Sequence, residues 1–216
     1  MRKLSVSSVI QEGFAVGLKN VLSLIGASIL WILTIWIPYI NVGTTIAMCS
    51  IPVALSKGKV LSPTFIFGSQ YRKQMGDFLI LEGLSSLAIF FAFCFLIIPA
   101  YVLTYSWSQA VYLLLDKEMN ATEALSQSNK LTYGHKWTLF GIDILIALIV
   151  ILAFCIFGGI AYVISDVLGV FTALIICILI LPFQMGCQAI IYKQLTTEVN
   201  VEKTNEAESV IETVLE

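Results

Sequence analysis

Five ionisable or amide side chains interrupt the long apolar stretches of this sequence, and they are the residues best placed to do chemistry. They are Glu82, Gln109, Asp143, Gln184 and Gln188. A carboxylate near the centre of a bilayer costs about 2.5–3.5 kcal/mol on insertion scales, so such groups normally face a helix bundle or water. Two roles fit them: hydrogen bonds that join helices without a ligand, or the lining of a polar cavity in the cytoplasmic half of the membrane. In either role we expect both carboxylates to face the bundle.

A second set of residues is basic and borders the apolar stretches. It comprises Lys19, Arg72, Lys73, Lys130, His135 and Lys136. At the level of the lipid headgroups, such side chains either bind phosphates or simply anchor helix ends. His135 is the single histidine, and no carboxylate or cysteine stands at a ligand spacing from it. The sequence therefore predicts no metal site.

No motif for catalysis is present. The chain contains no HExxH, GxSxG, Walker A or GxGxxG pattern, and no base is placed to activate a serine. Its five cysteines lie in apolar stretches without a CxxC pair, which is typical of small buried hydrophobic side chains, with zinc binding or disulfides as the less favoured alternatives. We predict that the protein is not an enzyme, has no cofactor and does not bind nucleic acid.

The elements that must position these residues are membrane helices. Of the 216 residues, 58% are hydrophobic and 12% are charged, and stretches of about 20 apolar residues are long enough to cross a hydrocarbon core. The apolar stretches are 21–40, 42–55, 78–98, 100–115, 137–157 and 170–192. We predict an all-α polytopic membrane bundle of about six spans. The short stretch 42–55 is also compatible with a re-entrant segment, and four spans with two re-entrant hairpins are the alternative topology.

Glycine and proline residues predict where these helices are interrupted. Gly158, Gly159 and Gly169, together with Ser165 and Asp166, predict a loop between the last two spans. In the final span, Pro182 predicts a kink.

Three shorter segments have an amphipathic helical pattern. They are 5–18, 62–74 and 121–133. Their apolar stripes are too short to span a bilayer, so we expect these helices to lie along the cytoplasmic interface. Each precedes a basic residue, a span, a turn and a second span. This order predicts a three-fold internal repeat with units of about 5–60, 61–118 and 120–195, inside a membrane domain of residues 1–197.

The distribution of charge predicts orientation. In the six-span arrangement every lysine and arginine falls on one side, and the positive-inside rule then places both termini in the cytoplasm of a bacterium, with the chain in its cytoplasmic membrane. Residues 198–216 are acidic, with six glutamates against one lysine. This tail is either disordered or an amphipathic helix that docks on the basic face or on a protein partner.

One segment resembles a known family. Residues 123–142 contain an alanine–leucine–serine–leucine–glycine–tryptophan–phenylalanine pattern that leads from an amphipathic helix into a span. The residues that carry it are Ala124, Leu125, Ser128, Leu131, Gly134, Trp137 and Phe140. The pattern resembles bacterial multi-span families of unknown function, including the YciC-like proteins, and is similar to the membrane domain of some glycerophosphodiester phosphodiesterases. The resemblance implies a fold and a location but no activity.

Two functions compete. The first is a non-enzymatic membrane module that binds lipid or a protein partner at the cytoplasmic face, favoured by the basic residues beside the amphipathic segments. The second is a transporter or permease subunit, favoured by the repeat and by the polar residues within the spans. The placement of those polar residues around a cavity, or away from one, discriminates between them.

Overall fold

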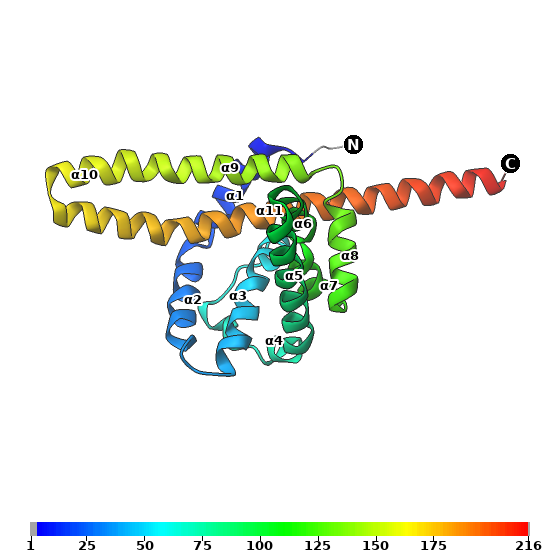
Figure 1. The fold of residues 1–216 in the computed structure, drawn as a ribbon, viewed down its shortest axis with the longest axis horizontal. Helices are drawn as coiled ribbons and strands as arrows, with labels where there is room; N and C mark the ends of the chain where they lie inside the picture. Colours follow the sequence, from blue (N-terminus) through cyan, green and yellow to red (C-terminus); the bar gives the residue numbers. More distant parts are fainter. Residues whose placement is uncertain (1–3, 216) are drawn as a thin grey trace.

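The structure is a computed structural model that describes the backbone of residues 4–215 and the side chains of residues 4–197. Within this part of the chain every regular element is a helix, which confirms the all-α prediction. The helices are α1 (Val6–Lys19), α2 (Val21–Thr34), α3 (Ile40–Ser56), η1 (Pro63–Phe67), α4 (Ser69–Lys73), α5 (Met75–Phe95), α6 (Ile97–Trp107), α7 (Ala110–Lys117), α8 (Ala121–Leu131), α9 (Lys136–Ala153), η2 (Phe154–Gly158), α10 (Gly159–Ile164) and α11 (Asp166–Leu215). Figure 1 shows their arrangement.

Three helical segments are long and apolar enough to cross a membrane. They are Met75–Phe95, Lys136–Ile164 and Asp166–Thr197. A fourth is obtained if α1 and α2, which meet at a bend of 73°, form one broken span, whereas the apolar helix α3 has only 17 residues. Most side chains of the three long segments are exposed, as expected for helices surrounded by lipid. Within the described residues, the protein therefore has three to four helices that could span a membrane.

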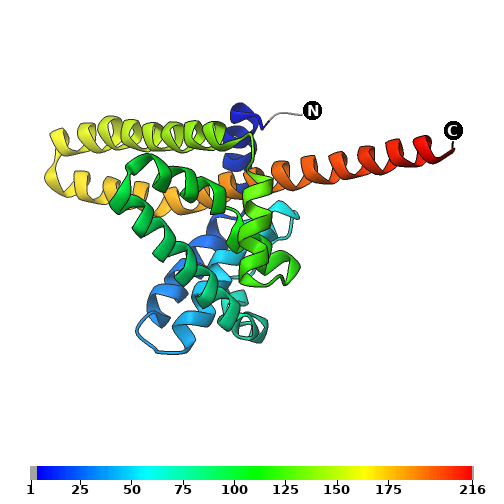
Figure 2. The same ribbon diagram turned by 45° about the vertical axis from the view of Figure 1, so that its right-hand side comes forward.

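The last two long segments form a helical hairpin that extends away from the other helices (Figures 1 and 2). The predicted connection between the two segments is reduced to Ser165, which has extended backbone and where the chain reverses. It is wrong for Gly158, Gly159 and Gly169, because η2, α10 and α11 run through them. Glycines are tolerated inside membrane helices because neighbouring helices satisfy the backbone. Gly169 lies against the Tyr162 backbone across the hairpin, so a glycine here permits close packing.

The predicted span 100–115 is two helices rather than one, because the chain breaks between α6 and α7. Side chains of the polar helix α8 satisfy the backbone there. Ser128 Oγ accepts a hydrogen bond from the backbone N–H of Gln109 at 3.2 Å and donates one to the carbonyl of Ser106 at 2.8 Å. The segment predicted as the helix 121–133 is thus a helix, but it packs on α6 and α7 through buried Ala121, Ala124 and Ser128.

Helix α1 runs antiparallel to α11 and packs closely against it. Near its start, Ser8 accepts a hydrogen bond from Gln194 at 2.7 Å, and near its end Gly17 lies against Pro182. The buried residues of α1 are Val9, Gly13 and Gly17, whereas the larger Phe14 and Leu18 are exposed. Because α1 runs along a candidate span, it does not lie flat along the membrane interface, as was expected for segment 5–18.

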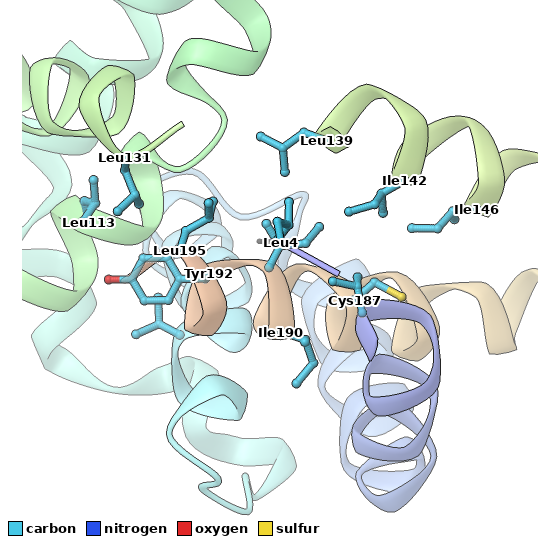
Figure 3. Close-up of a cluster of buried hydrophobic side chains, with 13 residues drawn as sticks. Leu4, Leu113, Leu131, Leu139, Ile142, Ile146, Cys187, Ile190, Tyr192 and Leu195 are labelled. Atoms are coloured by element: carbon cyan, nitrogen blue, oxygen red, sulfur yellow. The ribbon is translucent and has the colours of Figure 1, made fainter. Parts of the chain in front are cut away.

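The largest hydrophobic core forms where α7, α8, α9 and α11 meet the N-terminal segment (Figure 3). Tyr192 and Leu195 of α11 are fully buried there, and Ile142 of α9 belongs to the same core, where Figure 3 shows it on the side of Cys187. A second core joins α2, α3 and η1, with Leu24, Ile51 and Ile66 almost completely buried. The protein is thus held together around α11, which contributes to both cores.

Two parts of the sequence-based picture differ from this packing. Arg72 lies beside Gly43, near the N-terminal end of α3, whereas Lys57 caps the C-terminal end, about 20 Å away at 1.5 Å per residue. The basic residues therefore do not all share one end of the bundle. In addition, α11 continues without a break past Thr197 to Leu215, so no break marks the start of the acidic tail, whose side chains lie outside the described residues.

Candidate functional site

A cavity of about 450 Å³ lies between α2, α3, α7 and α11. Trp31 of α2, Cys49 of α3 and Val111 of α7 form part of its wall, and α11 contributes Met185 and Leu181. Its volume falls in the range of about 300–1,000 Å³ that is typical of small-molecule sites. The walls are mainly apolar, so the cavity suits a ligand with a hydrocarbon part.

Two of the five predicted polar residues line this cavity, namely Gln184 and Gln188. They are four residues apart on α11, a spacing that places side chains on the same face of a helix. Gln109 does not line the cavity. Its side chain is buried and donates a hydrogen bond at 3.2 Å to Ser108, which does line it.

The two predicted carboxylates lie outside the cavity wall. Glu82 of α5 is half-buried and lies within electrostatic range of the Cys49 thiol, on the wall. Asp143 of α9 is exposed and interacts with the Tyr105 hydroxyl. Asp143 also lies within electrostatic range of Tyr112 on the wall. The two acids therefore approach the cavity at different points, Glu82 at Cys49 and Asp143 at Tyr112, and do not form one site.

Four polar side chains of the cavity wall are occupied by hydrogen bonds inside the protein. The indole N–H of Trp31 donates to Thr45 Oγ1 at 3.0 Å, and Thr45 donates in turn to Asn41 Oδ1 at 3.1 Å. Ser28 donates to the backbone carbonyl of Leu24 at 2.8 Å, and Ser108 donates to that of Tyr105 at 3.0 Å. These groups shape the wall but have little hydrogen-bonding capacity left for a ligand.

Three other polar side chains of the wall have no hydrogen-bond partner among the described residues. They are Tyr112, Gln184 and Gln188. The Tyr112 ring packs edge-on against Tyr192, with centroids 5.9 Å apart, and this contact fixes its position. A hydroxyl and two carboxamides can each donate and accept hydrogen bonds. The wall thus offers an uncharged set of donors and acceptors to whatever occupies the cavity.

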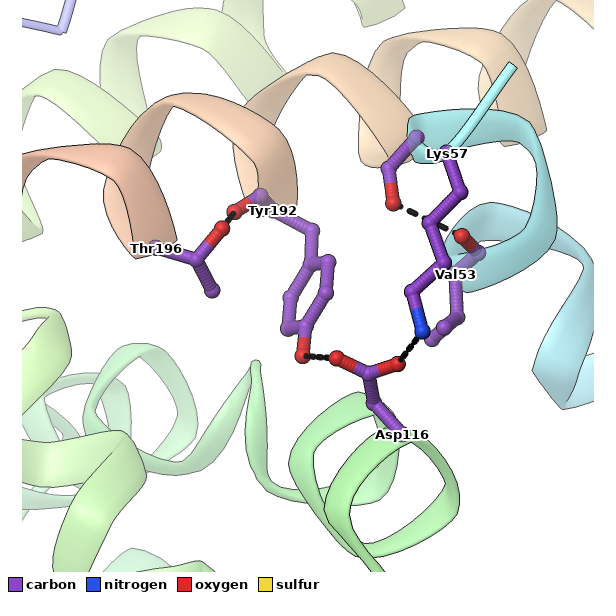
Figure 4. A network of polar contacts seen from close by, with 6 residues as sticks. Val53, Lys57, Asp116, Tyr192 and Thr196 are labelled. Carbon is purple, nitrogen blue, oxygen red and sulfur yellow. Dashed lines mark hydrogen bonds and ion pairs between the residues drawn. The ribbon is translucent and has the colours of Figure 1, made fainter. Parts of the chain in front are cut away.

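A polar network near the C-terminal end of α3 was not predicted from the sequence (Figure 4). The ammonium group of Lys57 forms an ion pair with one carboxylate oxygen of Asp116, and the Tyr192 hydroxyl donates to the other oxygen at 2.7 Å. The network joins α3, α7 and α11. In the sequence, Asp116 is followed by Lys117 and Glu118, which suggests only a solvated connection.

The predicted basic residues do not line the cavity. Lys19 on α1, Arg72 and Lys73 on α4, and Lys130 on α8 are exposed, and Lys136 donates to Asn129 Oδ1 at 3.3 Å. Across the described residues, no group of three or more His, Cys, Asp or Glu side chains is arranged to hold a metal ion. The cavity therefore remains the best-defined candidate for a binding site.

Comparison with protein-family models, with curated proteins and with solved structures finds no match to this chain. The resemblance to the YciC-like families accordingly stays a prediction. Any functional assignment depends on the geometry of the cavity in an all-helical protein with several helices able to span a membrane.

Proposed function

We propose that this chain is a non-enzymatic membrane module that binds a lipid, and that the cavity between α2, α3, α7 and α11 holds the lipid. The observation that carries the proposal is the cavity wall itself, which is apolar over most of its area and contains no lysine, arginine, histidine, aspartate or glutamate. Such a wall favours hydrocarbon over a solvated ion.

The position of the cavity supports a lipid that enters from the bilayer. Leu181 and Ile32 line the cavity and are also exposed at the protein surface. Leu181 lies about 18 Å along α11 from Lys193, and Gln188 lies about 7 Å from it, at 1.5 Å per residue. The cavity therefore occupies the part of the candidate span nearer to its basic end. A lipid could reach it sideways without crossing water.

Trp31 provides a direct test, because its indole lines the cavity. A variant that keeps Trp31 but carries Trp36→Phe, Trp107→Phe and Trp137→Phe is titrated in detergent micelles with brominated dioleoylglycerol and, separately, brominated dioleoylphosphatidylglycerol. Bromine quenches tryptophan at short range. We expect at least one of these lipids to quench Trp31 saturably, and the unbrominated lipid to reverse the quenching by competition.

The matched control keeps Trp137 in place of Trp31. Trp137 is 83% exposed and lies outside the cavity, so its quenching should rise linearly as lipid enters the micelle. Linear quenching of Trp31 by both lipids, equal to that of Trp137, would overturn lipid binding in the cavity.

A transporter or permease subunit is the second candidate function. Gln184 and Gln188 favour it, since they face a cavity in one half of a candidate span. The placement of Glu82 and Asp143 counts against it, because a proton- or cation-linked path needs a titratable group and neither carboxylate lines the cavity. Lipid binding is therefore the better-supported function.

We further propose that the chain crosses the cytoplasmic membrane six times, with α2, α3 and the α6–α7 pair joining the three long segments, and with both termini in the cytoplasm. The order of the elements supports a three-fold repeat, since short helical segments precede two apolar stretches in each of the units 5–60, 61–118 and 120–195. The excess of basic residues in the predicted cytoplasmic connections supports the orientation.

Cysteine labelling tests this topology in a background from which the five native cysteines have been removed. A membrane-impermeant maleimide added to intact cells should label Asn41→Cys and Asp166→Cys but not Gly58→Cys. Labelling of position 58 from outside would contradict the proposal. Gln70→Cys is a second test, because six spans place position 70 in the same cytoplasmic connection as position 58 and it should stay unlabelled. Labelling of position 70 from outside, as the contact of Arg72 with Gly43 would favour, would contradict the six-span topology.

A further inference from the structure

We infer that the cavity selects a lipid with an uncharged, hydroxyl-bearing headgroup over one with a phosphate headgroup. This inference rests on the proposed function, since it specifies the class of lipid that the cavity would bind. It is carried by the three wall side chains that have no hydrogen-bond partner among the described residues, Tyr112, Gln184 and Gln188.

The hydrogen-bonding capacity of these groups matches a hydroxyl. Each can donate and accept, and so can a lipid hydroxyl, which can donate to one carboxamide oxygen while it accepts from another wall group. A doubly ionised phosphate only accepts. It would leave the carboxamide oxygen of the half-buried Gln188 without a donor, and a polar group that is unsatisfied away from water costs free energy.

The charge around the cavity also disfavours a phosphate. No cationic side chain lines the wall, so a desolvated phosphate would have no counter-charge within it. Lys57 lies at the C-terminal end of α3, the helix that carries Cys49, and its ammonium group is already paired with Asp116. Two carboxyl groups act on the wall from outside it, Glu82 near Cys49 and Asp143 near Tyr112, and when ionised both repel an anion.

The experiment compares two lipids with identical acyl chains in the variant that keeps only Trp31. The probes are brominated dioleoylglycerol, which ends in a hydroxyl, and brominated dioleoylphosphatidate, which ends in a phosphate. We expect half-saturation of quenching at about tenfold lower dioleoylglycerol, since tenfold corresponds to about 1.4 kcal/mol and one or two buried hydrogen bonds contribute that much.

Variants then assign the selectivity to the wall. Gln184→Leu and Tyr112→Phe should each weaken dioleoylglycerol binding several-fold and dioleoylphosphatidate binding less, so that the ratio of the two affinities falls. Gln184 is exposed beside the cavity, so leucine at this position is compatible with a lipid-facing surface and folding is preserved. The matched controls are Gln70→Leu and Tyr133→Phe, which change exposed residues outside the cavity and should leave both affinities unchanged.

The outcomes separate this inference from the proposed function. Equal affinities, or tighter binding of dioleoylphosphatidate, would overturn the selectivity while leaving lipid binding in place. Selectivity that survives both Gln184→Leu and Tyr112→Phe would overturn the assignment to these side chains. If neither probe quenches Trp31 saturably, although brominated dioleoylphosphatidylglycerol does, only the selectivity fails; if all three fail, lipid binding fails too.

Discussion

The variant Gly186→Ala should unfold about 3 kcal/mol more easily than the parent protein, at the upper end of the usual cost of overpacking. A Cβ atom at position 186 would lie 2.1 Å from the carbonyl oxygen of Gly13 in α1. That oxygen belongs to the backbone of a helix, so it cannot rotate away as a flexible side chain would. The substitution must push α1 and α11 apart along their whole contact.

The contact between α1 and α11 is also close at the glycines of α1. A Cβ at Gly13 would lie 2.8 Å from the Cys187 backbone, and one at Gly17 would lie 2.5 Å from the Pro182 carbonyl oxygen. Small residues at four-residue spacing allow membrane helices to approach closely, and the resulting van der Waals packing replaces the hydrophobic drive that is absent in lipid. Gly13→Ala and Gly17→Ala should therefore destabilise the protein in the same direction.

The measurement is the unfolding midpoint in mixed micelles of dodecylmaltoside and increasing dodecylsulfate. Gly141→Ala and Gly83→Ala are the matched controls, because both residues are helical glycines with no atom within 4 Å of the added Cβ. Alanine has a higher helix propensity, so these controls should be neutral or more stable by up to about 1 kcal/mol. Equal midpoints for Gly186→Ala and Gly141→Ala would show that α1 does not pack on α11 as described.

Asp116→Ala should cost about 2 kcal/mol of stability, the second largest effect expected. The carboxylate is only 12% exposed, and it both pairs with Lys57 and accepts the hydrogen bond from Tyr192. A hydrogen bond to a charged group contributes about 1.5–3 kcal/mol. The ion pair adds little to this, because the Lys57 side chain is 49% exposed and solvent screens its charge.

A double-mutant cycle isolates the bond from Tyr192 to Asp116. Tyr192→Phe removes the hydroxyl that donates to Asp116 and should cost about 1.5 kcal/mol, whereas in the Asp116→Ala background it should cost close to nothing. Asp77→Ala is the control, since Asp77 is an exposed carboxylate at the start of α5. Additive effects of the two changes would contradict the network in Figure 4.

Several helices could be predicted from the sequence because their signals are local. The apolar stretch 78–98 and the polar segment 121–133 correspond to α5 and α8, since length and periodicity suffice to define them. The helix across Gly158 and Gly159 could not be predicted. Glycine breaks helices in water, but in an apolar hairpin the backbone keeps its own hydrogen bonds, and η2 and α10 continue through both residues.

The break between α6 and α7 could not be predicted from the sequence for a different reason. Residues 100–115 are apolar enough to form one helix, and the signal for the break lies elsewhere in the chain, in Ser128. A side chain 19 residues away satisfies the backbone of Gln109, so only the folded arrangement shows that the helix can end there.

The candidate site was predictable only in part. Polar residues that interrupt apolar stretches can be recognised in the sequence, and two of the five so identified, Gln184 and Gln188, lie on the cavity wall. The direction in which a side chain points depends on how each helix is rotated against its neighbours. For that reason Asp143, equally conspicuous in the sequence, is exposed on α9, and the apolar residues Trp31 and Val111 of the wall were not recognised.

The pairing of α1 with α11 fixes the order in which the protein can be assembled. Ser5 and Gln194 are hydrogen-bonded but 189 positions apart. The first helix to leave the ribosome therefore cannot form this contact until most of the chain has been synthesised. At roughly 5–20 residues per second, that delay is roughly 10–40 s. Throughout this time the glycine face of α1 has no α11 to pack against. The final step of biogenesis is then closure of the last helix onto the first, and chains truncated before Pro182 should remain open to quality-control proteases.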